Sequence, residues 1–199
     1  MNIKKTIITM ILAGCNAMTM GQNAAVTVLV AEEAEQKMVA QYLPQVNCVC
    51  TGVGASNVIK TLCTLPKGTK VINIGYAGSN TLEIGTVVRV SESHRMMDGT
   101  YQFIDHNNPL VFGTEGYPCY TSNSFVTASN DTLPTLYDME LNYMVAFPLD
   151  FVGAIKIVSD NLSIDAFRNN AIREAGILTS KDVWQHVVEL YHSLIDEQK

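Results

Sequence analysis

Apolar, β-branched runs alternate with helix-forming segments along most of the chain. The pattern predicts strands over residues 26–31, 47–51, 70–74, 86–91 and 151–158, and a short strand over 124–128. It predicts helices over residues 32–43, 55–65, 136–146, 163–175 and 181–198. Strands that alternate with helices indicate a mixed α/β sheet covered on both faces.

Glycine-rich turns and one irregular stretch separate these elements. The segment Gly75–Gly78 is expected to be a turn that ends the third strand, and residues 98–120, rich in Gly, Pro and Asn, are expected to be irregular with short strands. No repeat or linker divides the chain, so we expect one domain over residues 25–199. In such sheets ligands bind beyond the carboxyl ends of the strands, which directs attention to the residues there.

The composition is that of a chain with a substantial core. Of its 199 residues, 47% are hydrophobic and 16% are charged, which excludes a disordered chain. The net charge of −6 disfavours general binding to nucleic acids, because an acidic surface repels phosphates. No run of 18 apolar residues is present, so no permanent membrane span is expected.

The first 22 residues have the order of a bacterial export signal. Lys4 and Lys5 precede the apolar run Thr6–Leu12, and small residues follow. Two kinds of processing are compatible with them: lipidation of Cys15 in a lipoprotein box, or cleavage near residues 21–24. The second is favoured because the first leaves a very short apolar region. We therefore expect a periplasmic or lipid-anchored protein, the alternative being a cytosolic protein with a disordered extension.

Four cysteines remain outside this segment: Cys48, Cys50, Cys63 and Cys119. Their even number permits disulfides in an oxidising compartment, although ordinary semi-buried thiols fit the strand-like Cys48–Cys50 segment better. A Cys-x-Cys spacing without a nearby histidine is not typical of a zinc site. We expect no metal site and no cofactor.

Six segments, read in order, carry a family resemblance. They are Thr51–Gly54, Val71–Gly78, Glu83–Val88, Ser122–Val126, Asp138–Glu140 and Ile155–Asp160. Together they resemble the nucleoside phosphorylase/nucleosidase family, and most closely its 5′-methylthioadenosine/S-adenosylhomocysteine nucleosidase branch. The resemblance implies a three-layer α/β fold, with a central mixed sheet flanked by helices, and a homodimer that acts on a small nucleoside.

The resemblance also implies roles for residues near the last strand. Asp160, beside Ser159, resembles the acid that protonates the purine, which must accept charge as the glycosidic bond breaks. Glu140 resembles the glutamate that binds the ribose hydroxyls, and Met139 would pack against the sugar. The plain alternatives are a helix cap for Asp160, a first-turn surface charge for Glu140 and core packing for Met139.

Further roles fall on residues nearer the N-terminus and in the middle of the chain. Phe125 resembles the aromatic residue that stacks on the base, and the Val126 backbone would read the purine edge. Gap-free alignment gives Glu35 the role of the base that activates water, and Glu33, two positions earlier, is the rival candidate for that role. Tyr76 stands where the family has serine, and it would narrow the pocket or stack on the substrate. Core packing, or surface charges at a helix start, is the alternative in each case.

The same loops favour water over phosphate as the attacking group. Phosphorylases of this family hold phosphate with arginines, but residues 31–41 contain no arginine and Asn73 stands at the second arginine position. Phosphate needs cations or clustered N–H donors, whereas the first loop is acidic. Hydrolysis is therefore the expected reaction, and an exported enzyme would salvage bases outside the cytoplasm.

Two other functions stay open at this stage, because the chain departs from the family pattern. Asn123 and Lys156 replace the usual glycine and arginine, and the stretch 126–138 is several residues short. A nucleoside-binding relative without turnover would have its pocket filled by Tyr76, or Glu35 in solvent. A phosphorylase would need two cations at the site, with Arg89 or Lys156 as candidates. A nucleosidase requires Asp160, Glu140 and Glu35 to meet in one pocket.

Overall fold

A computed structural model describes residues 26–96, 109–168 and 176–199 of the chain. The expected export signal and Cys15 lie outside these residues, as do residues 98–108 of the expected irregular stretch and the end of the helix expected over 163–175. Within the described residues, no helix is both long enough and apolar enough to cross a bilayer.

The described residues form one mixed sheet of eight strands. These are β1 (Thr27–Val30), β2 (Asn47–Cys50), β3 (Lys70–Ser79), β4 (Val87–Arg95), β5 (Leu110–Val111), β6 (Tyr117–Thr121), β7 (Leu136–Asp138) and β8 (Asp150–Asp160). The sheet order is β2-β1-β3-β7-β6-β4-β5, and β8 pairs with both β3 and β4. Strands β3, β7, β6, β4 and β8 therefore close into a ring, and β1 and β2 extend parallel to β3 outside it.

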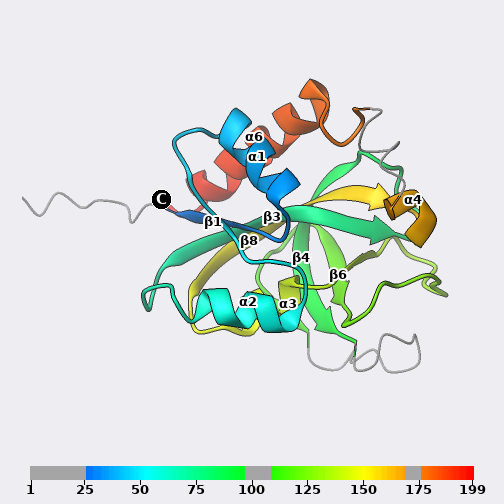
Figure 1. Cartoon of the computed structure of the whole chain (residues 1–199), viewed down its shortest axis with the longest axis horizontal. Coiled ribbons are helices and arrows are strands. Elements are labelled where there is room, and N and C mark those ends of the chain that lie inside the picture. Colours follow the sequence, from blue (N-terminus) through cyan, green and yellow to red (C-terminus); the bar gives the residue numbers. More distant parts are fainter. Residues whose placement is uncertain (1–25, 97–108, 169–175) are drawn as a thin grey trace, which may run out of the picture.

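Helices cover the sheet on two sides, as Figure 1 shows. Helices α1 (Glu33–Tyr42) and α6 (Lys181–Asp196) lie together on one side, and α2 (Ala55–Leu62) and α3 (Leu141–Ala146) lie on the other. The short helix α4 (Ile164–Arg168) follows β8. The expected three-layer α/β architecture, with a mixed sheet flanked by helices, is confirmed.

Strand β1 shows why the apolar runs predict buried strands. Successive side chains of a strand point to opposite faces, and all four residues of β1 are buried. Val28 and Val30 join the core cluster that contains Trp184 of α6, whereas Leu29 joins the cluster that contains Val58 of α2. Because both faces of β1 are covered, the strand is continuously apolar rather than alternating.

The prediction of a turn over Gly75–Gly78 is wrong, because β3 continues through these residues to Ser79. The two glycines instead let carboxyl groups of other elements approach the strand closely. A Cβ on Gly75 would stand 3.2 Å from Oε1 of Glu35, and a Cβ on Gly78 would stand 2.9 Å from Oδ1 of Asp160. Glycine is needed here because carboxyl groups pack against the strand.

Two further predictions are corrected around the short stretch between β6 and α3. The helix expected over 136–146 begins only at Leu141, because Leu136–Asp138 forms β7, fully buried between β3 and β6. The short strand expected over 124–128 is absent from the described structure. There the Ser124 N–H donates to Oγ of Ser122, a local turn bond that competes with strand pairing.

The last helix anchors one face of the sheet. The side chain of Ser180 caps α6 by accepting a hydrogen bond from the Val183 N–H. Trp184 is fully buried, its Nε1 donates to the Leu178 carbonyl at 2.8 Å, and its ring stacks on Tyr42 with centroids 5.7 Å apart. One side chain thereby joins α6, α1 and the segment before α6.

We expect Trp184→Ala to lower the free energy of unfolding by about 3–5 kcal/mol, because it leaves a large cavity and an unpaired carbonyl. Gln185→Ala, at the exposed neighbouring position of α6, is the matched control and should change the free energy of unfolding by less than about 0.5 kcal/mol. Urea unfolding of both variants measures the difference. Equal values for the two variants would contradict the packing described here.

Candidate active site

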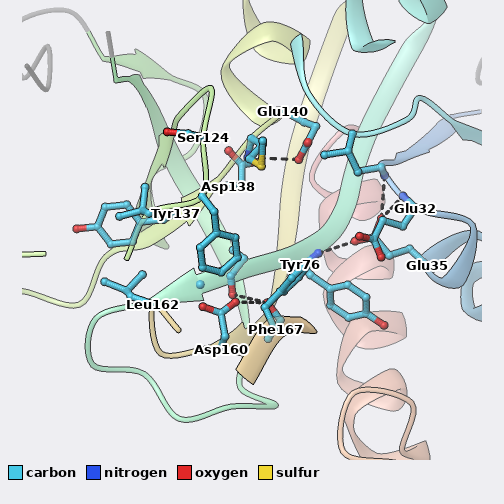
Figure 2. A pocket seen from close by; sticks show the side chains of 18 residues that line it. Glu32, Glu35, Tyr76, Ser124, Tyr137, Asp138, Glu140, Asp160, Leu162 and Phe167 are labelled. Atoms are coloured by element: carbon cyan, nitrogen blue, oxygen red, sulfur yellow. Dashed lines mark hydrogen bonds between the residues drawn. The ribbon is translucent and has the colours of Figure 1, made fainter. Parts of the chain in front are cut away.

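A cavity opens where the carboxyl ends of β3, β7 and β8 meet the start of α1. It contains about 620 Å³ of empty space, part of it open to solvent. All eight residues that the resemblance assigns to the site line this cavity: Glu35, Tyr76, Phe125, Val126, Met139, Glu140, Ser159 and Asp160. Figure 2 shows the carboxyl groups of Glu35, Glu140 and Asp160 arranged around it.

Glu35 is fixed by three backbone N–H donors. Its Oε2 accepts hydrogen bonds of 2.8 Å from the N–H groups of Ala31 and Glu32, and its Oε1 accepts one of 2.7 Å from Tyr76. Burial raises the pKa of the Glu35 carboxyl, although the hydrogen bonds from Tyr76 and Glu32 and the charge of Lys156 act in the opposite direction. The rival, Glu33, is exposed and does not line the cavity, so the structure brings only Glu35 to the site.

Glu140 lies at the start of α3 and reaches the loop before α2. Its Oε1 accepts a 2.7 Å hydrogen bond from the Gly54 N–H, where a backbone φ of +84° favours glycine. Burial, and then the negative charge of Asp138, raises the pKa of Glu140 from 4.5 to about 7. The residue is 6% exposed and lines the cavity.

Asp160 ends β8 and is almost completely buried, at 1% exposure. Its Oδ2 accepts a 2.9 Å hydrogen bond from the Ser159 hydroxyl, whose oxygen also lies 3.3 Å from the Ala77 carbonyl. The side chain packs directly against Gly78 of β3. Asp160 therefore belongs to β8 and faces the cavity, and it is not the cap of a following helix.

A buried ion pair lies beneath the cavity. The Lys156 ammonium donates to Oδ2 of Asp138 at 2.8 Å, and both side chains are at most 2% exposed. Burial alone would lower the pKa of Lys156, but Asp138, together with Cys119 and Glu140, raises it above the ordinary value. Lys156 therefore stays charged although it is out of contact with water.

The cations that a phosphate site would need do not line the cavity. Among the described residues around it there is no lysine, arginine or histidine. Arg89 forms a salt bridge of 2.7 Å with Glu197 at the end of α6, and Lys156 is paired with Asp138. Asn73 donates to the Leu29 carbonyl at 3.0 Å inside the core.

The aromatic residues divide between core and cavity. Tyr76 is 9% exposed, and it belongs to the core cluster beneath α1 and α6, so it does not fill the cavity. Tyr76 lines the cavity, and its N–H donates a hydrogen bond to Glu35. Phe125 faces Phe167 of α4 across the cavity wall, with ring centroids 5.3 Å apart and planes tilted by 52°.

Sequence reasoning missed several lining residues. They are Ala31, Glu32, Val53, Ala77, Gly78, Ser124, Tyr137, Asp138, Leu162 and Phe167. Phe167 and Leu162 closely follow Asp160, so their distance from it along the chain was a usable signal. Tyr137 was missed because its strand was expected to be a helix.

No metal site is built from the described side chains, since no group of three or more His, Cys, Asp or Glu residues among them is arranged to hold an ion. The cysteines outside the expected export signal are free thiols: Cys48 and Cys50 are half-buried, Cys63 is exposed and Cys119 is buried. Burial raises the pKa of the Cys48 thiol to about 12, so it is not a reactive thiolate.

Comparison with solved structures places the fold. A futalosine hydrolase mutant of Helicobacter pylori superimposes with a TM-score of 0.63 at 14% identity, over 86% of this chain and 98% of that one. A mutant of the Helicobacter pylori 5′-methylthioadenosine/S-adenosylhomocysteine nucleosidase (MTAN), with 5′-methylthioadenosine (MTA) in its active site, gives a TM-score of 0.62 at 11% identity, over 87% of this chain and 99% of that one. MTAN from Chlamydia trachomatis bound to MTA gives 0.59 at 15% identity, over 85% and 98%.

Comparisons with models of protein families and with curated proteins found no match. The structural matches nevertheless span nearly the whole length of each neighbour. The chain therefore has the fold of the 5′-methylthioadenosine/S-adenosylhomocysteine nucleosidases and of futalosine hydrolase, as the sequence resemblance implied.

The contact between Gly78 and Asp160 can be tested by a double-mutant cycle. Gly78→Ala should lower the free energy of unfolding by about 1–3 kcal/mol, because its Cβ would meet Oδ1 of Asp160 at 2.9 Å. In an Asp160→Ala background the same change should cost at least about 1 kcal/mol less, since the oxygen is gone. Chemical denaturation of the four proteins measures the coupling, and additive costs would contradict it.

The raised pKa of Glu140 predicts a pH-dependent effect on stability. Because the folded state holds this proton more tightly, the contribution of Glu140 to stability should fall as pH rises from 4.5 towards 7 and then level off. Relative to wild type, Glu140→Gln should gain about 3 kcal/mol across that window, at about 1.4 kcal/mol per pH unit. Urea unfolding at several pH values measures it. The exposed Glu33→Gln is the control, and a difference that does not change with pH would contradict the prediction.

Proposed function

We propose that this chain is a nucleosidase that hydrolyses the N-glycosidic bond of a purine-type nucleoside similar to 5′-methylthioadenosine or S-adenosylhomocysteine. The observation that carries the proposal is the meeting of Glu35, Glu140 and Asp160 in one cavity whose described lining contains no cation. The fold neighbours support it, since their names are those of nucleosidases and of a nucleoside-related hydrolase.

Asp160 is proposed as the general acid. As the bond between C1′ and the purine nitrogen breaks, its electron pair moves onto the purine, and the protonated Asp160 carboxyl delivers its proton to N7. The Ser159 hydroxyl, which donates to Oδ2 at 2.9 Å, orients the carboxyl and stabilises the carboxylate that remains. Burial in the cavity wall keeps water from competing for this proton.

Glu140 is proposed to bind the ribose. A carboxylate can accept hydrogen bonds from both hydroxyls of a cis-diol, and it stabilises the positive charge that develops on the sugar. The Gly54 N–H fixes one of its oxygens at 2.7 Å, so the group is oriented before substrate arrives. Met139, beside it in the lining, would pack against the sugar face.

Glu35 is proposed to activate water. The water oxygen forms the new bond to C1′ while Glu35 takes one of its protons, and solvent later exchanges protons with Glu35 and Asp160 to restore both groups. Burial favours a base with a raised pKa, which is better matched to a proton from water near neutral pH. The products are the free base and the 1′-hydroxyl sugar.

The remaining lining supplies a place for the base. Phe125 and Phe167 present two aromatic rings at one side of the cavity, and stacking on such rings recognises a purine face. The buried Val126 follows Phe125 directly, so its backbone is available to the purine edge. These contacts support the proposal of a purine-type base.

Two expectations outside the described site are also part of the proposal. Residues 1–22 would export the protein, with either lipidation at Cys15 or cleavage near residues 21–24, so that hydrolysis would take place outside the cytoplasm. The protein would act as a homodimer. The cavity opens in part to solvent, where a second subunit could complete it.

The proposal predicts release of free base from a nucleoside without phosphate. A panel that includes 5′-methylthioadenosine, S-adenosylhomocysteine, adenosine and inosine, each with and without phosphate, is assayed for free base by chromatography. Asp160→Asn should lower kcat about 100- to 10,000-fold, the usual contribution of a positioned acid or base, and Glu35→Gln should do likewise. Glu33 lies two residues before Glu35 and is exposed, so Glu33→Gln should leave the rate near wild type.

The outcomes separate the three functions. Phosphate-dependent release would mean a phosphorylase. Binding of nucleosides, measured by calorimetry, with no release from any of them would mean a relative without turnover. Thermal unfolding of each variant is needed alongside, because Glu35 also accepts hydrogen bonds at the start of α1.

A further inference from the structure

Lys156 is an unexpected neighbour for this cavity. Among the described residues it is the one lysine or arginine that is buried, at 2% exposure. It lies beneath a cavity whose titratable lining residues, apart from tyrosine, are all acidic: Glu32, Glu35, Asp138, Glu140 and Asp160. A buried charge needs partners close by, so the contacts of Lys156 indicate what it serves.

The first contact of Lys156 holds the segment that carries Glu140. Its ammonium binds Oδ2 of Asp138 at 2.8 Å, and the same oxygen accepts the Leu141 N–H at 2.9 Å. The other oxygen of Asp138 accepts the Thr121 hydroxyl at 2.6 Å. Because Asp138 precedes Glu140 by two residues and Leu141 follows it, the ion pair fastens the chain on both sides of Glu140.

Gly75 of β3 is the place where Lys156 and Glu35 come close to each other. Lys156 pairs with Gly75 in the register of β8 and β3. A Cβ on Gly75 would lie 3.2 Å from Oε1 of Glu35 and 3.5 Å from Nζ of Lys156. The missing side chain therefore leaves room for the ammonium and the carboxyl group beside the same position of β3.

We propose that Lys156 is a positioning residue of this site: its ion pair with Asp138 fixes the turn that presents Glu140, and its charge offsets the buried carboxylates Glu140 and Glu35. It does not enter the cavity lining, so it acts on substrate only through neighbouring groups that do line it. The importance of this for turnover rests on the proposed hydrolysis, because ionised Glu140 and Glu35 are needed there.

The charges around Lys156 agree with this assignment. The titratable groups that face it are Asp138 on β7, Cys119 on β6, Glu140 at the start of α3 and Glu35 on α1. Lys156 lowers the pKa of both glutamates, against the effect of burial, whereas Asp138 raises that of Glu140. Removal of the lysine charge should therefore move the titration of Glu140 upwards, and removal of the aspartate charge should move it downwards.

The test reads the carboxyl group directly. The protein is labelled with ¹³C at the glutamate side-chain carboxyl, the Glu140 signal is assigned by its loss in Glu140→Gln, and its pKa is measured by NMR. Four variants are compared with wild type: Asp138→Asn, Lys156→Met, Lys156→Arg and the double variant Asp138→Asn/Lys156→Met. The double variant matters because Lys156→Met alone leaves a buried, unpaired carboxylate that can unfold the protein.

We expect the pKa of Glu140 to fall in Asp138→Asn and to rise by roughly one unit or more when Lys156→Met is added to it, the usual effect of an adjacent opposite charge. Lys156→Arg keeps the charge and should keep the wild-type titration. An unchanged pKa between Asp138→Asn and the double variant would overturn the proposal, as would a Lys156→Arg titration like that of Lys156→Met.

This outcome is independent of turnover, since no substrate is present. If the titration shifts as expected in a protein that releases no base from any nucleoside, the proposed function fails and the positioning role stands. If base is released but the titration does not depend on Lys156, the reverse holds. In an active protein, the acid limb of the kcat/KM profile should move to higher pH in the double variant relative to Asp138→Asn.

Discussion

The need to satisfy buried carboxyl groups governs this structure more than any other requirement. An unpaired buried carboxylate is costly, so each one must find donors. Glu35 takes three backbone N–H groups, Glu140 takes the Gly54 N–H, and Asp160 takes a serine hydroxyl. Two of these donors, the N–H groups of Tyr76 and Gly54, lie far from their acceptors in sequence, so the site forms only when the sheet and its helices have come together.

The local pattern was enough to predict the sheet and its covering layers. It was insufficient where the conformation of a residue depends on contacts with residues distant in sequence. The strands β1 and β8 were predictable because burial on both faces demands continuous apolar residues. Gly75 and Gly78 instead suggested a turn, because glycine gives the same signal for a turn and for close approach of a side chain. The Leu136–Asp138 segment resembled a helix, since its pairing with β3 and β6 is visible only in three dimensions.

The residues of the candidate site were predictable chiefly through the family resemblance, and the structure explains why composition alone could not identify them. Glu35 takes part in the capping box of α1 and also lines the cavity, so its place at a helix start does not distinguish the two interpretations. A surface charge at a helix start and a buried site residue differ only in what packs above them. Leu162 and Phe167 belong to no matching motif, so the one sequence signal for their place in the cavity wall was their nearness to Asp160 along the chain.

The closed ring of β3, β7, β6, β4 and β8 has a consequence for how this site can diverge. A ring has no free edge, so Asp160 and the Asp138–Glu140 segment are held in a frame whose strands cannot drift apart one at a time. Glu35 arrives from outside that frame, on a helix that follows β1, and Phe167 arrives on the short α4. Changes in α1 or α4 can therefore reshape the wall of the cavity, while the ring that positions Asp160 and Glu140 keeps its geometry.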